Sequence, residues 1–360
     1  MYGEISFNET ITLEDTVFID IRSPHEFSQG SIPGSINIPL FSDEEREIIG
    51  ILYKDDHQKA RIKGLNFATK KLPDLIENIK NMSSQKTPVL YCWRGGMRST
   101  SLYSLLEMME IPGYKLKGGY KSFRRFILDQ LDNYELKKPV FVLNGLTGVG
   151  KTEVLHILTE MDCPTIDLEG LACHRGSLFG HLGIKNLRKQ KDFDALLWNR
   201  LEELKNADYL IVEGEGKRIG SIYQPEFLFR AITGETRILL TAPLENRVNR
   251  LLKEYTPSTP GEIKKVEEAI LLLEKYLGKE TINSFLMLLY QENYFELVSQ
   301  LCRLYYDRLY SDSRPGKIKF EKFIDSSNSR KAAEEIREFM HKTLKDTDLA
   351  EVSPINIREE

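Results

Sequence analysis

The sequence predicts an α/β protein with two α/β domains and a helical C-terminal region. Short apolar runs typical of buried strands alternate with helix-favouring segments, which indicates parallel sheets. The 360 residues exceed what one ordinary hydrophobic core accommodates. One predicted strand leads into a cysteine-containing loop and a later one into a glycine-rich loop. We expect domains over residues 1–130, 138–258 and 259–345.

The composition excludes several classes of protein. The chain is 41% hydrophobic and 29% charged with a net charge of −4, so a nucleic-acid partner would need local basic patches. No apolar run approaches the ~20 residues of a membrane span, and the first residues lack the pattern of a secretory signal. The four cysteines have no C-x-x-C spacing, which favours a reducing cytoplasm over a disulfide scaffold or zinc site. We therefore expect a cytoplasmic protein with no membrane association.

In the first domain, residues 16–21 are typical of a buried strand and end at a Ser-Pro turn. Residues 30–39 contain two glycines and two prolines and are expected to form a loop with a short extended run. Residues 89–91 form the next predicted strand, and a helix is expected from Ser99 onward. The segment that begins at Cys92 therefore lies between the end of a strand and the start of a helix.

That segment, residues 92–98, has the sequence CWRGGMR. A thiolate is favoured by loop N–H groups, a helix amino end and nearby arginines, and Cys92 is predicted to have all three. The alternative is that a cysteine after a strand acts only as a small buried hydrophobic residue. The arginines and glycines that follow Cys92 are unlike core residues and are suited to binding an anion. We interpret Cys92 as catalytic, with Arg94 and Arg98 as its anion cradle, and the other cysteines as structural.

The C-x5-R spacing also occurs in cysteine phosphatases. Those enzymes usually have a histidine before the cysteine, where this chain has Tyr91, and they need an aspartate as general acid. The upstream sequence favours another family, because DIRSPHEF at 20–27 and GSIPGSINIP at 30–39 closely resemble the rhodanese signature, and LKGGY at 116–120 resembles its C-terminal segment. The resemblance implies a domain that carries sulfur or selenium on the loop cysteine.

The second domain is expected to begin after a junction between Phe126 and Lys138. Residues 140–143 form a strand that leads into GLTGVGKT at 145–152, a full G-x-x-x-x-G-K-[ST] motif, and a helix is expected to follow. Backbone N–H groups of such a loop point at phosphate, with the lysine on the outer oxygens and the threonine on Mg²⁺. The alternative, a glycine turn without a ligand, is disfavoured by this context. The predicted binding residues are Gly145, Thr147, Gly148, Gly150, Lys151 and Thr152.

Further polar residues follow the predicted strands at 209–213 and 237–240. Glu213 and Glu215 are candidate magnesium or water-orienting carboxylates, or else surface carboxylates at a strand end. Arg247 and Arg250 either close over phosphates as a lid or are solvated helix charges.

A second substrate is expected where polar residues cluster near another short strand, although the histidine there suits an ordinary loop equally well. They are Asp167, Glu169, His174 and Arg175. Beyond about Pro260 the pattern is helical, with apolar stripes at 271–273 and 285–289.

The order of a rhodanese-like domain and a phosphate-loop domain resembles the bacterial tRNA 2-selenouridine synthase family over nearly the whole chain. The CWRGG loop at 92–96 and the HRGS segment at 174–177 are the specific parts, since a phosphate loop alone is generic. The sequence departs from the expected pattern at Cys173, where a polar residue is expected, and at 213–217, which is a looser acidic stretch.

The resemblance implies a two-step modification of the wobble uridine of certain tRNAs. 2-Thiouridine is S-geranylated from geranyl diphosphate, and the geranylthio group is then displaced by selenium from selenophosphate, with Cys92 as the chalcogen carrier. The diphosphate, with Mg²⁺ at Thr152 and Glu213, would fill the phosphate loop, and the leucine-rich C-terminal helices would supply an apolar groove. Selenophosphate would be attracted by Arg94 and Arg98.

The tRNA would bind to clusters of basic residues. The alternative is that these clusters are ordinary solvated surface. These are Lys185, Arg188, Lys189 and Lys191, and Lys117, Lys121, Arg124 and Arg125.

Two other functions fit the same motifs. One is an NTP-dependent sulfurtransferase or kinase fused to a sulfur carrier, which nucleotide turnover by the purified protein would favour. The other is a nucleotide-switched tRNA-binding module whose cysteine loop only senses anions, which an inert Cys92 would favour.

Overall fold

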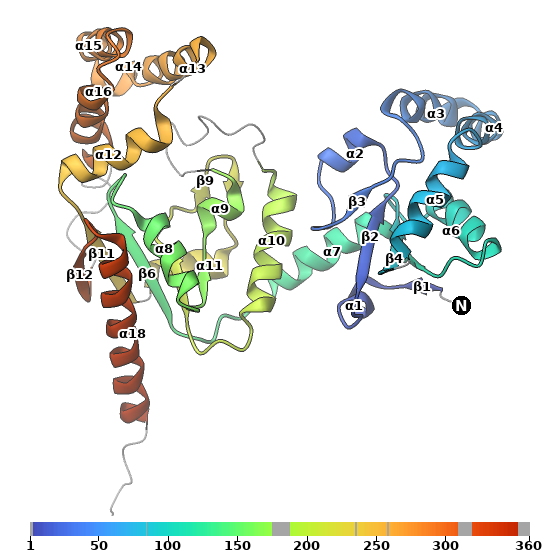
Figure 1. Cartoon of the computed structure of the whole chain (residues 1–360), viewed down its shortest axis with the longest axis horizontal. Coiled ribbons are helices and arrows are strands. Elements are labelled where there is room, and N and C mark those ends of the chain that lie inside the picture. The colour runs from blue at the N-terminus through green and yellow to red at the C-terminus, as the bar shows by residue number, and fades with distance from the viewer. Residues whose placement is uncertain are drawn as a thin grey trace, which may run out of the picture. The chain divides into compact units, whose positions relative to one another are not determined.

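The computed structural model describes residues 3–83, 85–174, 188–234, 236–257, 259–308 and 319–351. It divides into two compact units (Figure 1). Unit 1 comprises residues 1–134 and 189–199, and unit 2 comprises residues 135–188 and 200–360. Each contains a parallel five-stranded sheet with helices, which confirms the α/β class. Within these ranges, no helix is both long and apolar enough to cross a membrane.

The sheet of unit 1 has the order β1-β5-β4-β2-β3. The central strand β4 pairs in parallel with β2 and β5, so its carboxyl end opens in the middle of the sheet edge, directly before Cys92. The strands are β1 (Glu4–Ile5), β2 (Thr16–Asp20), β3 (Ile36–Asn37), β4 (Thr87–Tyr91) and β5 (Tyr114–Leu116).

The helices of unit 1 bury apolar side chains against this sheet, and one core joins Ile19 and Leu90 to Ile79 and Leu102. Capping boxes fix the starts of three of them, where Ser6 pairs with Glu9, Ser23 with Glu26 and Ser42 with Glu45. The helices are α1 (Phe7–Thr10), α2 (Pro24–Ser28), α3 (Asp43–Asp55), α4 (His57–Ala68), α5 (Leu72–Ser83), α6 (Met97–Met108) and α7 (Gly119–Asp132).

The sheet of unit 2 has the order β12-β11-β6-β8-β7. All residues of β6 are buried, and it pairs in parallel with β11 and β8. These strands are β6 (Val140–Gly145), β7 (Thr165–Ile166), β8 (Leu210–Glu213), β11 (Thr236–Thr241) and β12 (Lys322–Asp325), beside an antiparallel pair of β9 (Arg218–Ile219) and β10 (Ile222–Tyr223).

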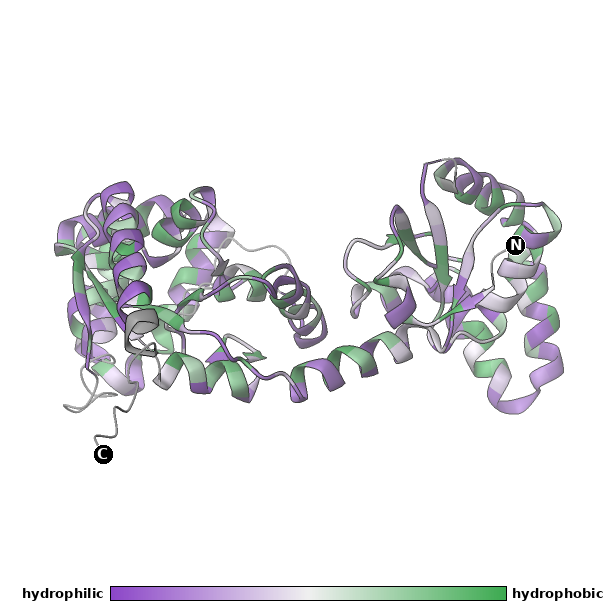
Figure 2. Cartoon of the chain, turned by 90° about the horizontal axis from the view of Figure 1, so that it is seen from below, coloured by the Kyte–Doolittle hydropathy of each residue, from purple (hydrophilic) through white to green (hydrophobic). Residues whose placement is uncertain are grey.

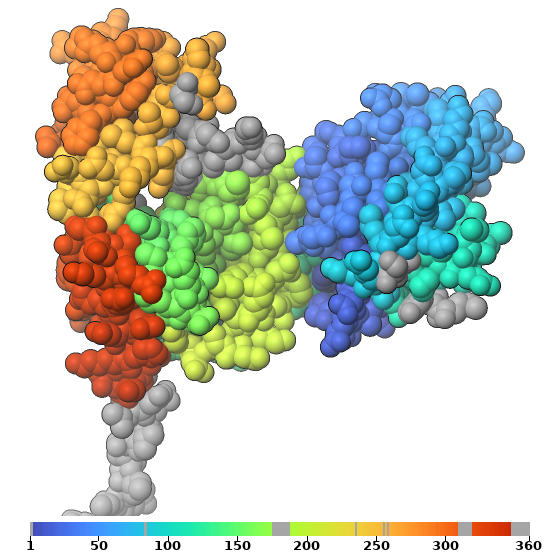
Figure 3. Space-filling model, in the orientation of Figure 1, coloured from blue at the N-terminus to red at the C-terminus, as the bar shows by residue number. Residues whose placement is uncertain are grey.

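Helices cover the sheet of unit 2, and α18 packs beside α8 (Figure 3). The helices of both units are banded in hydrophobic and hydrophilic residues (Figure 2), as expected when one face is buried. Residues 190–199 of α10 group with unit 1, and the last residues of this helix group with unit 2. The helices are α8 (Lys151–Glu160), α9 (Leu168–Ala172), α10 (Gln190–Glu203), α11 (Glu226–Gly234), α12 (Leu244–Tyr255) and α18 (Ser329–Glu351).

The predicted helical region holds α13 (Pro260–Leu271), α14 (Glu274–Leu277), α15 (Lys279–Tyr290) and α16 (Tyr294–Leu301), with a π-helical turn at Cys302–Tyr306. Their shared core includes Ile270, Phe285 and Leu289. The expectation needs one correction, because β12 lies within 259–345 and extends the sheet in parallel with β11. Only Ile324 of this edge strand is buried, so no apolar run marks it in the sequence.

Candidate active site

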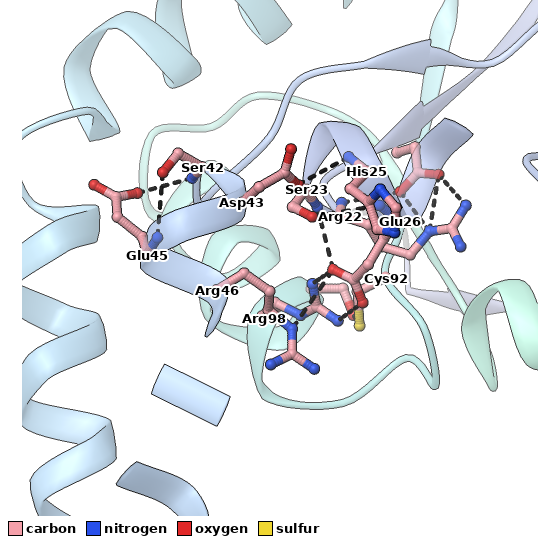
Figure 4. A network of polar contacts seen from close by, with 12 residues as sticks. Arg22, Ser23, His25, Glu26, Ser42, Asp43, Glu45, Arg46, Cys92 and Arg98 are labelled. Atoms are coloured by element: carbon pink, nitrogen blue, oxygen red, sulfur yellow. Dashed lines mark hydrogen bonds and ion pairs between the residues drawn. The ribbon is translucent and has the colours of Figure 1, made fainter. Parts of the chain in front are cut away.

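Cys92 lies directly after β4, five residues before α6 begins (Figure 4). Its Sγ is 3.2 Å from the hydroxyl of Ser99, in the first turn of α6. The residue is only 3% exposed and packs beside the core of unit 1. The loop therefore places a nearly buried sulfur at the junction of strand and helix that the sequence predicts.

The surroundings of Cys92 favour its thiolate. Burial opposes ionisation, but hydrogen bonds from the Ser99 side chain and backbone, the charge of Arg98 and the Arg94 N–H outweigh it and lower the Cys92 pKa. By contrast, burial raises the pKa of Cys163, and it raises that of Cys302 to about 11. Cys92 is thus the most acidic of these three thiols.

Replacing Ser99 by alanine is expected to raise the pH midpoint for alkylation of Cys92 by on the order of one pH unit, since one hydrogen bond to the thiolate is lost. The midpoint would be read from the rate of modification by iodoacetamide in a Cys173→Ser background. Ser101→Ala, an exposed hydroxyl on the same helix, is the matched control. A midpoint that moves equally in both variants would contradict this role of Ser99.

The two loop arginines have different environments. The Arg98 guanidinium forms two hydrogen bonds to Glu26, at 2.6 and 3.0 Å, and Arg46 lies 3.6 Å from the same carboxylate (Figure 4). Arg94 is exposed, and no hydrogen bond or ion pair of its side chain occurs among the described residues. Arg94 is therefore the one open to an incoming anion, while Glu26 orients Arg98 beside the sulfur. Sequence reasoning missed this role of Glu26, although the residue lies within the rhodanese-like DIRSPHEF segment.

The GGY segment explains how the cysteine loop keeps its shape. Gly95 and Gly119 both have positive φ, at 65° and 58°, and a Cβ at Gly119 would collide with the carbonyl oxygen of Cys92. The N–H groups of Tyr120 and Lys121, at the start of α7, donate to the carbonyls of Cys92 and Trp93, both at 2.9 Å. The start of α7 thus holds the loop directly.

The phosphate loop has the strand–loop–helix context that its motif requires. It leaves β6 at Gly145, turns through Gly148 and Gly150 with φ of 78° and 92°, and enters α8 at Lys151. The Lys151 Nζ lies 3.5 Å from the carbonyl oxygen of Gly145 and 3.4 Å from a carboxylate oxygen of Glu215. The lysine is therefore folded back over the loop.

Three glutamates gather beside this loop. The Thr152 hydroxyl is 3.4 Å from Glu169, while Glu213 accepts a 2.6 Å hydrogen bond from the Glu169 N–H. The other Glu213 oxygen is buried without a hydrogen-bond partner in the described part of the chain. Across the same residues, no group of three or more His, Cys, Asp or Glu is arranged to hold a metal ion. The glutamate beside Thr152 is therefore Glu169. The assignment of Thr152 and Glu213 as magnesium ligands stays a prediction.

Two carboxyls of this cluster, those of Glu169 and Glu213, hold protons more tightly than usual. Burial, aided by the charge of Glu215 and opposed by Lys151, raises the pKa of Glu169 to about 8. Burial and then the charges of Glu169 and Glu215 raise the pKa of Glu213 well above its ordinary value. A cation brought into the cluster would relieve this repulsion.

These shifts predict that the free energy of unfolding falls as pH rises. A glutamate in the unfolded chain loses its proton near pH 4.5, whereas folded Glu169 keeps it to about pH 8. Between these values the folded protein binds more protons, which costs about 1.4 kcal/mol per pH unit for each group. Glu213→Gln, which cannot ionise, should reduce the slope in urea unfolding followed by circular dichroism from pH 5 to 8. The exposed Glu268→Gln is the control, and an equal slope in both variants would contradict the assignment.

Arg247 and Arg250 are not solvated helix charges, and their role as a lid over phosphates stays a prediction. The Arg247 side chain is only 4% exposed, donates to the carbonyl oxygen of Thr147 at 2.9 Å and pairs with Asp307 at 2.6 Å. Arg250 donates to the carbonyl oxygen of Val149 at 3.0 Å. The N–H groups of such a loop face phosphate. The two arginines of α12 hold the loop through its carbonyl oxygens, so the N–H groups stay available for a ligand.

The remaining predicted residues are partly used within the fold. Asp167 caps α9 through the Gly170 N–H at 2.7 Å and pairs with His156 at 2.9 Å. A Cβ at Gly220 would meet the ring of His174, so that histidine packs against a turn. Arg175 lies outside the described residues.

The two basic clusters differ in how much of their charge is available. Arg188 donates to two carbonyl oxygens at the end of α9, and Lys189 donates to Gln29. Arg124 pairs with Asp194. Lys185 lies outside the described residues. The exposed basic side chains of the other cluster are Lys117, Lys121 and Arg125.

The fold and these sites define a rhodanese-like domain joined to a phosphate-loop domain. The family model of the rhodanese-like domain matches residues 6–126, and that of the tRNA 2-selenouridine synthase AAA domain matches residues 138–346. The chain therefore belongs to the tRNA 2-selenouridine synthase family.

Relatives extend over most of the chain. It is 33% identical over 265 residues to a tRNA 2-selenouridine synthase of Nitrosomonas europaea, covering 72% of this chain and 68% of the relative. It is 30% identical over 358 residues to one of Psychromonas ingrahamii, covering 92% and 95%. Among solved structures, a shikimate kinase of Bacteroides thetaiotaomicron is 16% identical and covers 57% of this chain and 98% of the kinase, with a TM-score of 0.24, too low to bear on the assignment.

Proposed function

We propose that this chain is an enzyme that replaces the sulfur of wobble 2-thiouridine in tRNA by selenium. The observation that carries the proposal is the presence of an acidified thiol and a phosphate loop on a chain of this family. The relatives are named for 2-selenouridine synthesis in tRNA. A thiol that carries a chalcogen and a loop that binds a diphosphate suit a two-step transfer.

In the first step, the sulfur of 2-thiouridine attacks the first carbon of geranyl diphosphate, and diphosphate leaves. The loop at residues 145–152 binds the diphosphate, and Lys151 neutralises the charge that grows on the leaving oxygen. Mg²⁺, which prefers a few oxygen ligands together with phosphate oxygens, would be held by Thr152 with Glu213. The unpartnered, buried oxygen of Glu213 supports this choice.

In the second step, the selenium of selenophosphate attacks C2 of the geranylated base, the geranylthio group leaves as geranylthiol, and water takes the phosphoryl group as phosphate. Cys92 is the proposed carrier residue: selenophosphate is held beside it, and the selenium stays at the selenide level, so no oxidant is needed. Arg94 is exposed and suits the phosphate part of selenophosphate. Despite burial, the hydrogen bonds from Ser99 lower the pKa of Cys92, and the charge of Arg98, which Glu26 holds in place, adds to this effect. The exposed Leu272, Tyr276 and Tyr290 of the helical region offer apolar surface for the geranyl chain.

Purified protein supplied with 2-thiouridine-containing tRNA tests the proposal. With geranyl diphosphate alone, mass analysis of the tRNA nucleosides should detect S-geranyl-2-thiouridine. Addition of selenophosphate should convert it to 2-selenouridine. Hydrolysis of a nucleoside triphosphate without either product would instead favour an NTP-dependent sulfurtransferase or kinase.

A further inference from the structure

The cysteine loop carries a large aromatic side chain at its surface. Trp93, directly after the buried Cys92, is 37% exposed, whereas the second tryptophan of the chain, Trp198, is 5% exposed. A single exposed aromatic needs no explanation by itself. Trp93 differs from a scattered surface aromatic because it lies next to the Cys92 sulfur and because its ring packs against buried side chains.

The indole of Trp93 is held in a fixed position. The centre of its ring lies 5.6 Å from the centre of the Tyr120 ring. The Arg22 guanidinium in turn lies 4.2 Å from the centre of the Tyr120 ring. Arg22 is 1% exposed and forms a bidentate pair with Asp20. The Trp93 carbonyl accepts from the Lys121 N–H. The exposed part of the indole is therefore a rigid surface backed by a buried stack.

Positive charges surround this surface. The Lys191 ammonium is 5.9 Å from the Trp93 ring, and the Lys191 stem is close to Gly30, where an added Cβ would lie 3.3 Å away. Lys121 is exposed beside it, and so is Arg94. One carboxylate, that of Asp192, acts on the neighbouring Tyr120, so the charges around the indole are mostly positive. An aromatic platform among cations is how proteins bind single-stranded nucleic acid without reading its sequence.

We propose that Trp93 is the stacking platform for an unpaired nucleobase of the RNA substrate and holds that base beside Cys92. The inference rests on the proposed function, which brings tRNA to the cysteine loop. Unpaired loops are the parts of RNA whose bases can leave their stack and lie on an aromatic side chain. A geranyl chain is the other candidate occupant, but the cations beside Trp93 suit a phosphate backbone and a stacked base better than an apolar chain.

The two tryptophans make a direct test possible. In full-length Trp198→Phe protein, Trp93 is the sole tryptophan, and a stacked base should quench its fluorescence. The probe is a short single-stranded RNA that contains uridine, titrated without geranyl diphosphate or selenophosphate. Trp93→Phe protein, which retains only the buried Trp198, is the matched control and should respond little. Quenching by geranyl diphosphate but not by RNA would overturn the proposal.

Affinity provides a second readout. Trp93→Ala should weaken RNA binding by on the order of tenfold to a hundredfold, whereas Trp93→Phe should retain most of it, because a phenyl ring still stacks. An unchanged alkylation rate of Cys92 would show that the loop is intact in both variants. Equal affinity of Trp93→Ala and the unchanged protein would overturn the proposal.

These measurements separate the two proposals. Quenching in a protein that forms no 2-selenouridine leaves the platform standing and removes the proposed activity. Normal selenation by Trp93→Ala, with an unchanged KM for tRNA, removes the platform alone.

Discussion

Replacement of Cys92 by serine is expected to abolish formation of 2-selenouridine while S-geranyl-2-thiouridine still forms. The serine hydroxyl is nearly isosteric but does not ionise near neutral pH, so the variant lacks the thiolate on which the proposed second step depends. The first step uses the phosphate loop and not the thiol, so the geranylated nucleoside should accumulate. Mass analysis of nucleosides from tRNA treated with the variant and both substrates would measure the two products.

Cys173→Ser is the matched control for this prediction. It removes a half-buried thiol that lies outside the cysteine loop, whereas Cys92 is buried, and it should leave both products unchanged. Full selenation by the Cys92→Ser protein would rule out Cys92 as the selenium carrier.

Replacement of Lys151 by alanine is expected to weaken binding of geranyl diphosphate by ten- to a hundredfold. The variant loses a charge-assisted contact of roughly 1.5–3 kcal/mol. It also leaves Glu215, 3.4 Å from the ammonium in the unchanged protein, without this neighbouring charge. The remaining carboxylates would then repel the diphosphate more strongly.

Calorimetric titration with geranyl diphosphate would measure the change, together with the kinetics of geranylation. Lys137→Ala removes an exposed lysine paired with Glu135 and controls for loss of one positive charge. Unchanged geranylation kinetics in Lys151→Ala would place the diphosphate outside this loop.

The sequence predicts the two sites because each is local. The CWRGGMR and GLTGVGKT segments contain their own turn residues and lie between a strand and a helix, so the chemistry and the backbone are encoded together. The α/β class follows in the same way from the alternation of apolar strands and helices.

What the sequence does not predict depends on residues that meet only in the fold. Glu26 reaches Arg98 from a distant helix, and Arg247 meets Thr147 across a hundred positions. Glu169, and not Glu213, is the neighbour of Thr152, while one Glu213 oxygen accepts from the Glu169 N–H, and no local pattern in the sequence marks either contact. The edge strand β12 exposes most of its residues and therefore lacks the apolar pattern by which the other strands are recognised.

The arginines of α12 also bear on the thermodynamics of ligand binding. They tie Thr147 and Val149 to Asp307 and to the segment around Ser326, so the glycine-rich loop has its shape before any diphosphate arrives. The conformational entropy of ordering this loop is thus lost when the chain folds and not when the ligand binds. Association should then proceed in a single kinetic phase, with a heat-capacity change that reflects only the surface buried between the ligand and the site, and no ordering of the loop.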